Sequence, residues 1–392
     1  MENEEAEFRS LFAKYLAWKD SQKSQTDGYE YERSFIEFTR LMNKELFDMS
    51  VKNTNTDSVT RKKKVQTSLG EVCVDQNHCL TKSGKKGFRQ SHYLQELGCY
   101  VGQLVPFDEG SVCLNKLSGI SLTDKQIERL VHHYGEVLEQ LDNDDSVTEH
   151  TGKIDQEPHY AMMDGSMVFV RKEGWKELKL GRIFAQSACY HEKKRGVISQ
   201  SRYVAHLGNH EDFLAKFDYE VCNTKQIIAI SDGARWIWDY WSTNYPEAIQ
   251  ILDFFHLIEK IGLWAVLVIK DSPQRKDWIN LCEKLLLNNE ASEVELMIQS
   301  IDCQGDKKDN QTKLLTYLTN NKQRINYKTY LDDGLFIGSG AMESANKEVV
   351  QKRMKLSGQR WTLKGAQQVV NLRIALKNDE WGKLVSQIKM AA

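Results

Sequence analysis

The hydrophobic pattern of residues 157–256 changes period in a fixed order, and this order limits the fold more than any other feature of the sequence. Residues 159–171, 175–190 and 196–206 are typical of three successive strands, with Glu173-Gly174 as the first turn. The pattern then alternates, and it predicts helices at 210–221 and 234–244 and strands at 226–230 and 248–254. A meander followed by alternating helices and strands predicts a mixed α/β sheet.

Two aspartates lie at matching places in this pattern. Asp164 lies within the first strand, where a charge among apolar neighbours is costly unless it has a function. Asp232 follows the apolar run at 227–230. The strand order is that of a ribonuclease-H-like sheet, whose first and fourth strands are neighbours, so we expect these carboxylates to meet at one edge. Glu343 opens a helix predicted after a glycine-containing loop at 334–340, where its carboxylate is expected to complete a triad.

Three carboxylates gathered in this way can hold two Mg²⁺ or Mn²⁺ ions about 4 Å apart, which suits the cleavage of a phosphodiester. The alternative is that these three residues have only structural roles. Asp164 and Asp232 each precede a glycine, and Asp-Gly is a frequent turn dipeptide, while Glu343 alone is typical of a solvated helix residue. The spacing by itself leaves both interpretations open.

The remaining segments are mainly helical in pattern, so the expected fold class is α/β plus helical modules. The expected regions are an N-terminal helical segment (1–50), a basic β element (51–93), a helix-turn-helix-like DNA-binding module (94–145), the first part of a ribonuclease-H-like catalytic domain (157–256), an all-helical insertion (257–333) and the C-terminal helices of that domain (334–392).

The helix-turn-helix outline comes from three predicted helices within residues 94–145. Asp108 is expected to cap the second helix, and Gly119 supplies the turn before the third. Thr123 and Gln126 form a capping box at the start of the third helix. Ordinary helical hairpins share this outline. If the third helix enters a major groove, its exposed Lys125 and Arg129 are the candidates for DNA contact.

The net charge of −2 conceals two basic segments. Residues 61–90 carry eight Lys and Arg against two acidic residues, and residues 347–389 carry ten against three. Such segments are compatible with binding a polyanion, although each is also typical of a solvated face. The candidate DNA-contacting residues in them are Arg61, Lys62, Lys63, Lys64, Arg353, Lys355, Arg360 and Trp361.

The chain has the composition of a folded protein, with 24 glycines, 4 prolines and 41% hydrophobic residues in 392. Its longest apolar run, residues 261–269, is too short to cross a membrane, and its acidic start differs from a signal peptide, so a cytoplasmic location is expected. The eight cysteines contain no C-x-x-C pair. Cys73, His78, Cys79 and His92 fit no standard four-ligand spacing, so structural zinc is not expected.

Six ordered segments resemble bacterial insertion-sequence transposases of the ISKra-type DDE group, which is related more distantly to Mutator-like transposases. They are residues 163–165, 174–179, 230–238, 251–256, 337–344 and 353–361, with the resemblance covering roughly 60–380. It implies that the acidic triad is Asp164, Asp232 and Glu343. It also matches Asp253 and His256 to the group's [C/D]-x-x-H signature, which implies a role close to the active site.

The resemblance implies a transposase that uses two Mg²⁺ or Mn²⁺ ions to cut DNA at terminal inverted repeats and to join the freed end to target DNA. Its expected partner is double-stranded DNA, on which a homodimer or a larger assembly forms. Two alternatives remain open: a domesticated, non-cutting DNA-binding regulator, and a stand-alone structure-specific nuclease.

Overall fold

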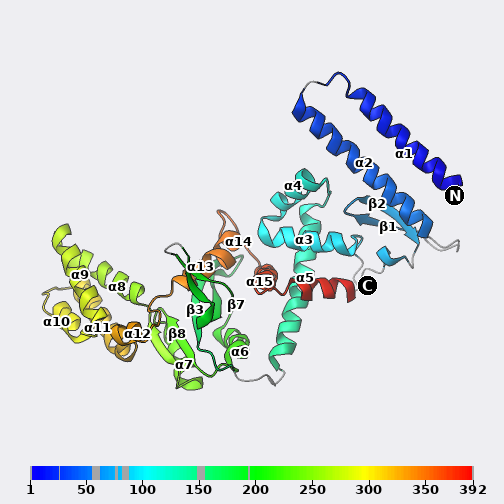
Figure 1. The fold of residues 1–392 in the computed structure, drawn as a ribbon. Coiled ribbons are helices and arrows are strands. Elements are labelled where there is room, and N and C mark those ends of the chain that lie inside the picture. Colours follow the sequence, from blue (N-terminus) through cyan, green and yellow to red (C-terminus); the bar gives the residue numbers. More distant parts are fainter. Residues whose placement is uncertain are drawn as a thin grey trace. The chain divides into compact units, whose positions relative to one another are not determined.

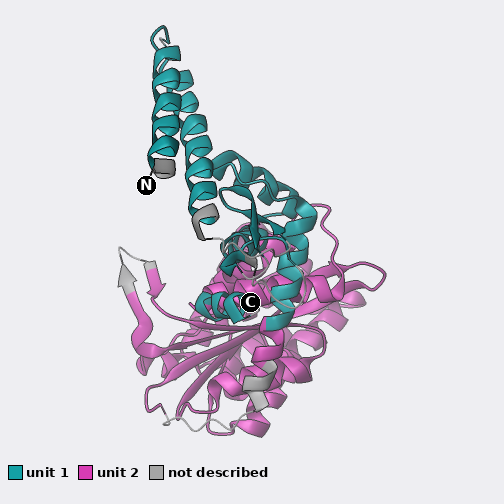
Figure 2. Ribbon diagram, turned by 90° about the vertical axis from the view of Figure 1, so that its right-hand side faces the viewer, with its two compact units in different colours: residues 1–137, 381–392 teal, residues 138–380 magenta. Residues whose placement is uncertain are grey.

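The computed structural model describes residues 2–25, 27–54, 62–75, 78–81, 88–147, 155–192 and 195–390. The chain divides into two compact units (Figure 2). Unit 1 contains Met1–Val137 and Trp381–Ala392, and unit 2 contains Leu138–Glu380. The architecture is mixed α/β, with helices predominating and one central mixed sheet in unit 2 (Figure 1). In the described segments, no helix combines the length and apolar character needed to cross a membrane.

Unit 1 begins with an antiparallel helical hairpin of α1 (Glu2–Ser21) and α2 (Gly28–Thr54). The break at Asp27-Gly28 is confirmed, and Asp27 Oδ1 accepts a hydrogen bond from the N–H of Tyr29 (2.9 Å). The indole of Trp18 stacks on Phe38 and its N–H donates to Ser34 Oγ (2.8 Å). Aromatic packing therefore joins the two helices.

The basic β element is a two-stranded antiparallel hairpin of β1 (Lys62–Thr67) and β2 (Gly70–Asp75), as its alternating pattern predicts. A short 3₁₀ helix follows at Cys79–Thr81. Val65, Val72 and Val74 of the hairpin pack with Val51 at the end of α2 in a small core. Lys62 and Lys64 lie on the other face of β1, and Lys63, on the valine face, is exposed as well. Burial of one face and charge on the other explain why so short an element forms.

The helical triplet consists of α3 (His92–Leu104), α4 (Phe107–Ser118) and α5 (Asp124–Val147). Gly119 ends α4 in the left-handed conformation (φ +69°), as expected. The predicted capping box is confirmed, because the N–H of Gln126 donates to Thr123 Oγ1 (3.3 Å) and the N–H of Thr123 donates to Gln126 Oε1 (2.9 Å). Asp108 is not a cap: it lies within the first turn of α4, whose N-cap position is Pro106.

The last helix, α16 (Trp381–Met390), packs on α3 and belongs to unit 1. The indole N–H of Trp381 donates to Glu96 Oε1 (3.2 Å), and its ring packs edge-on against Tyr100. From the sequence, this segment is expected to belong with residues 334–380. Its apolar face instead packs on α3. Local periodicity predicts an apolar face but not which distant helix it contacts.

The sheet of unit 2 has the strand order β7-β4-β3-β8-β9. Its strands are β3 (His159–Val170), β4 (Gly174–Ala185), β7 (Arg202–Leu207), β8 (Ile227–Ser231) and β9 (Ile249–Leu252). β3, β4 and β7 form the predicted antiparallel meander, and β8 and β9 run parallel to β3. The predicted strands at 175–190 and 196–206 are too long. Their facing ends form a separate hairpin, β5 (Cys189–Glu192) with β6 (Arg195–Ile198).

Helices connect and cover these strands. They are α6 (His210–Val221) and α7 (Arg235–Asn244) within the sheet region, then α8 (Phe254–Val268), α9 (Ser272–Leu287), α10 (Ala291–Gln299), α11 (Asp306–Asn320) and α12 (Tyr327–Asp332), and finally α13 (Gly340–Ala345), a π-helical segment (Asn346–Gln351), α14 (Lys352–Met354) and α15 (Leu363–Lys377), with 3₁₀ turns at Gln186–Ala188 and Lys322–Arg324. The expected helical stretch is observed, and it starts three residues earlier than predicted, at Phe254.

Candidate metal centre

The pairing of β3 with β8 brings Asp164 and Asp232 to one edge of the sheet. The strands are parallel, with Met162 opposite Ile230, and each aspartate lies two residues beyond this pair. The two carboxylates are close enough that the charge of Asp232 adds to the effect of burial on the pKa of Asp164. The two aspartates thus lie on neighbouring strands, and their joint role as metal ligands stays a prediction.

The half-buried Asp164 receives two hydrogen bonds, one on each oxygen. Oδ1 accepts from the N–H of Gly165 (2.7 Å), and Oδ2 accepts from Nδ2 of Asn346. Burial raises the pKa of the Asp164 carboxyl above its ordinary value, the charges of Asp232 and Glu177 raise it further, and the two hydrogen bonds lower it. The net result is that the surroundings of Asp164 do not fully stabilise its charged form.

Residues on the same face of the sheet as Asp164 anchor the segment that carries Glu343. Arg182 of β4 donates from Nη1 to the carbonyl of Ala341 in α13 (2.6 Å). Ser166 of β3 accepts from Lys355 Nζ just after α14 (2.9 Å). Together with the bond from Asn346 to Asp164, these contacts fix α13 and the π-helical segment over the metal-candidate edge.

Glu343 itself does not join the two aspartates. Its side chain is exposed on α13, one turn before Asn346, and residues three apart share a helix face. Within the described ranges, no group of three or more His, Cys, Asp or Glu side chains is arranged to hold a metal ion. The structure therefore places two of the three predicted carboxylates on neighbouring strands. The amide of Asn346, which was not predicted from the sequence, is hydrogen-bonded to Asp164.

Asp253 is a positioning residue rather than an open ligand. It is buried and is the N-cap of α8, where Oδ1 accepts from the N–H groups of Phe255 (2.8 Å) and His256 (3.2 Å). Its Oδ2 accepts from the N–H of Ser339 (3.2 Å) and from the Ser339 hydroxyl. One carboxylate thus joins the start of α8 to the loop that leads into α13.

His256 lies in the first turn of α8 with a partly exposed ring. Its Nδ1 is 3.5 Å from Glu259 Oε2 on the same helix. The role implied for His256 by the resemblance stays a prediction.

Tyr317 is a second residue that the sequence analysis missed. It lies on α11, and its hydroxyl donates to the main-chain carbonyl of Asp232 (2.6 Å). Burial raises the pKa of the Tyr317 phenol, and the charges of Asp232 and Asp253 raise it further. Gly233 has φ +99°, and a Cβ there would lie 2.7 Å from the Tyr317 hydroxyl, so the position requires glycine. No local pattern links residues 85 positions apart.

The predicted DNA contacts near the end of unit 2 divide by burial. Lys355 and Arg360 are exposed. Arg353 is only 1% exposed, with its guanidinium carbon 5.1 Å from the centre of the Trp361 ring. Trp361 is buried, its indole N–H donates to the carbonyl of Met354 (3.0 Å), and its main chain bonds to β3. The prediction that Arg353 and Trp361 contact DNA does not fit this burial, since core packing encloses both side chains.

The predicted DNA contacts of unit 1 are at the surface where they are described. Lys62, Lys63 and Lys64 lie exposed on β1, and Lys125 and Arg129 lie exposed on the first turns of α5. Arg61 lies outside the described residues.

A known protein is similar to this chain over most of its length. No protein-family profile matches the chain. The chain is similar to the "UPF0236 protein in vanSb 3'region" of Streptococcus gallolyticus, with 23% identity in an alignment 400 positions long that covers 93% of this chain and 84% of that protein.

Proposed function

We propose that this protein is a DNA transposase of the DDE type whose unit 2 is a ribonuclease-H-like catalytic domain. The observation that carries the proposal is the parallel pairing of β3 with β8, which sets Asp164 beside Asp232 at one edge of the sheet. The strand order, with an antiparallel meander followed by two parallel strands, supports the ribonuclease-H-like assignment. The resemblance to ISKra-type transposases supports the same chemistry.

The residues at this edge fit a divalent cation. Mg²⁺ prefers carboxylate and amide oxygens, and Asp164 and Asp232 supply the carboxylates. Asn346 Oδ1 is buried beside Asp164, and no residue in the described part of the chain forms a hydrogen bond with it. A buried acceptor without a donor is costly, and a cation would satisfy it. Asp164, Asp232 and Asn346 would hold the ion, with Glu343 one turn away.

In this proposal, neighbouring residues hold the metal-ligand carboxylates in a fixed orientation. The N–H of Gly165 and the amide of Asn346 fix the Asp164 carboxylate. Tyr317 fixes the main chain at Asp232, and Asp253 fixes the loop before α13. Bound divalent ions would activate the attacking oxygen and stabilise the leaving oxygen of a phosphodiester. Pre-formed orientation of this kind lowers the entropic cost of the reaction.

A second candidate is a DNA-binding regulator that does not cut, and the position of Glu343 favours it. The Glu343 carboxylate is exposed, and Asn346 rather than Glu343 is bonded to Asp164. In this arrangement the third predicted carboxylate does not take part in the metal site. Binding without cleavage is what this arrangement would give if it persists on DNA.

The test combines cleavage, joining and binding. The protein is incubated with Mn²⁺ or Mg²⁺ and labelled DNA that carries the inverted repeats flanking its own locus. We expect cuts at the repeat tips and joining of the labelled end to target DNA. Asp232→Asn should reduce cleavage by at least about 10²-fold while binding stays near normal, because it removes a metal-ligand charge. Asp239→Asn on α7, also a carboxylate-to-amide change but at an exposed position, is the control.

Each outcome separates the candidates. Cutting without joining supports the stand-alone nuclease, and binding without cutting by the wild type supports the regulator. Residual cutting by Asp232→Asn within tenfold of wild type, with the control unchanged, would refute the metal assignment.

A further inference from the structure

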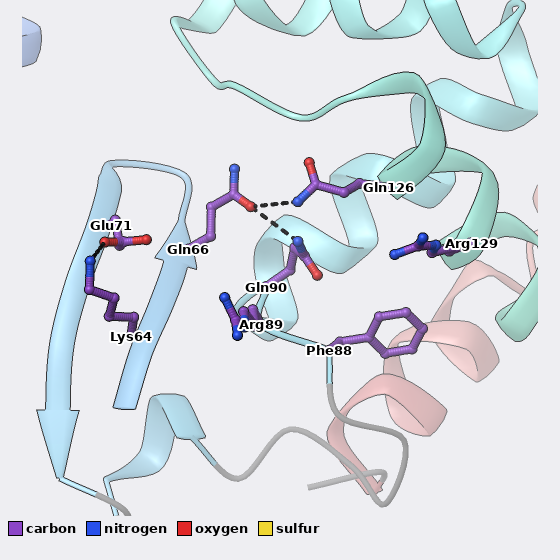
Figure 3. A pocket seen from close by; sticks show the side chains of 8 residues that line it. All are labelled: Lys64, Gln66, Glu71, Phe88, Arg89, Gln90, Gln126 and Arg129. Carbon is purple, nitrogen blue, oxygen red and sulfur yellow. Dashed lines mark hydrogen bonds and ion pairs between the residues drawn. The ribbon is translucent and has the colours of Figure 1, made fainter. Parts of the chain in front are cut away.

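A polar pocket in unit 1 joins the basic hairpin to the start of α5. It has a volume of about 420 Å³, within the range of small-molecule and cofactor sites. Three segments form it, β1 with β2, residues 88–90, and α5 (Figure 3). The lining residues are Lys64, Gln66, Glu71, Phe88, Arg89, Gln90, Gln126 and Arg129. The sequence predicts the hairpin and α5 as separate DNA-binding elements, whereas in the structure they line one pocket.

Three glutamines hold the walls of this pocket together. Gln66 Oε1 accepts from Gln90 Nε2 (3.0 Å) and from Gln126 Nε2 (3.1 Å), as Figure 3 shows. Gln66 Nε2 donates to the carbonyl of Ser121. Gln126 Oε1 is engaged in the capping box with Thr123. Because Gln66 and Gln126 use both ends of their amides internally, they fix the distance between β1 and α5 and are not available to read a ligand.

The groups that remain for a ligand are cationic. Lys64 is paired with Glu71 (2.8 Å), a contact that raises the pKa of Lys64 and lowers that of Glu71. Arg89 and Arg129 line the pocket with exposed side chains, and within the described residues neither forms an ion pair. The pocket therefore has two guanidinium groups in excess over its acidic charge.

We propose that this pocket binds one phosphate of the DNA backbone together with its sugar, clamped by Arg89 from the hairpin side and Arg129 from α5. A guanidinium presents a planar fork that matches phosphate oxygens. The pocket is larger than one phosphate requires, and the Phe88 ring, packed against His133 and Tyr134, gives an apolar wall for the sugar. The inference rests on the DNA-binding part of the proposed function.

This site positions DNA rather than reading its sequence, because phosphate contacts set register and base contacts specify. A duplex held between the hairpin and α5 would be fixed in register at one nucleotide. The proposal therefore assigns Arg129 to the DNA backbone rather than to a base edge in the major groove.

The test measures DNA affinity against salt by fluorescence anisotropy with EDTA present, so that no cleavage occurs. Arg89→Gln and Arg129→Gln should each weaken binding to repeat and random duplexes alike, on the order of tenfold, and reduce the salt slope by about 0.9. Arg89→Lys and Arg129→Lys keep the charge and lose the fork. They should keep most of the slope while losing affinity, which identifies a shaped site. Lys19→Gln on α1, an exposed cation distant in sequence, is the control.

Several results would overturn the proposal. These are slopes unchanged in both glutamine variants, full affinity in both lysine variants, or a loss of repeat-over-random preference in Arg129→Gln without a change in slope, which indicates base reading. Inorganic phosphate or a mononucleotide that displaces DNA at micromolar concentration would show a free-nucleotide site instead. A wild type that binds DNA through both arginines and never cuts would refute the proposed cleavage and leave this site standing.

Discussion

At the scale of single residues, the negative charge of Asp164 at the sheet edge destabilises the folded protein. Burial raises its pKa in the folded protein, so the folded state binds its proton more tightly than the unfolded chain does. The carboxylate therefore opposes folding at neutral pH. Its penalty grows as the pH rises from the ordinary aspartate pKa of about 3.9 through the raised value.

Asp164→Asn should accordingly raise the melting temperature of the metal-free protein at pH 7, and the gain should shrink toward pH 4. The amide at 164 can still accept from Gly165, and a flipped Asn346 can use its unpartnered Oδ1 to accept from it. Melting curves from pH 4 to 8 check this. If the variant melts below the wild type at every pH, the charge of Asp164 does not destabilise the folded protein and this explanation is wrong.

Residue-level prediction from sequence succeeds where local chemistry decides and fails where distant segments meet. The capping box of Thr123 and Gln126 and the adjacency of Asp164 to Asp232 follow from short-range pattern and strand order. Tyr317 and Asn346 were missed, because their roles arise only when helices from distant parts of the chain pack on the strand ends. The burial of Arg353 was also missed, since charge alone predicts exposure.

At the scale of elements, Tyr317 ties α11 to the end of β8. Tyr317→Phe removes the hydroxyl that donates to the Asp232 carbonyl and leaves that half-buried acceptor without this donor. We expect a loss of about 1–3 kcal/mol in the free energy of unfolding, together with weaker stabilisation by Mn²⁺, because the loop at Asp232 loses its support.

Urea denaturation with and without Mn²⁺ measures both effects. Tyr245→Phe is the matched control, since its hydroxyl donates to Asp218 Oδ1 (2.8 Å) away from the sheet edge. It should lower stability without changing the Mn²⁺ increment. Equal Mn²⁺ increments in the two variants would show that Tyr317 has no part in positioning Asp232.

Element boundaries were predictable to within a few residues where a turn residue or cap marks them. The hairpin of β5 and β6 was not, because its residues continue the strand-like pattern on both sides. Only its separate pairing, from Cys189 with Ile198 to Glu192 with Arg195, distinguishes it from the sheet. The π-helical segment at Asn346–Gln351 leaves no sequence signal either, although such segments often occur at functional sites.

At the scale of the whole molecule, the hairpin of α1 and α2 exposes several large apolar side chains to solvent. Among its described side chains, only Leu11 and Val51 are buried hydrophobics, whereas Phe8 is 68% and Tyr29 66% exposed. Large exposed apolar faces mark association surfaces. We expect two copies of the chain to pair through these hairpins.

Phe8→Ser combined with Phe12→Ser should shift this dimer toward monomer by at least about tenfold in dissociation constant, since aromatic side chains dominate such interfaces. Sedimentation velocity across a concentration series measures it. Val112→Ser, which changes an exposed apolar residue of α4, should have no effect. A wild type that is monomeric at all concentrations, with and without DNA, would contradict the expectation.

The hydrogen bond from the N–H of Phe254 to the carbonyl of Ile337 closes the helical stretch between β9 and α13 into a loop with adjacent ends. Asp253 and Ser339 reinforce this closure from the side. In evolutionary terms, we expect most of the stretch to be exchangeable. Its length and content can change without moving the strands, provided that the two residues at its neck, the aspartate beside them and Tyr317, which supports the main chain at Asp232, are kept.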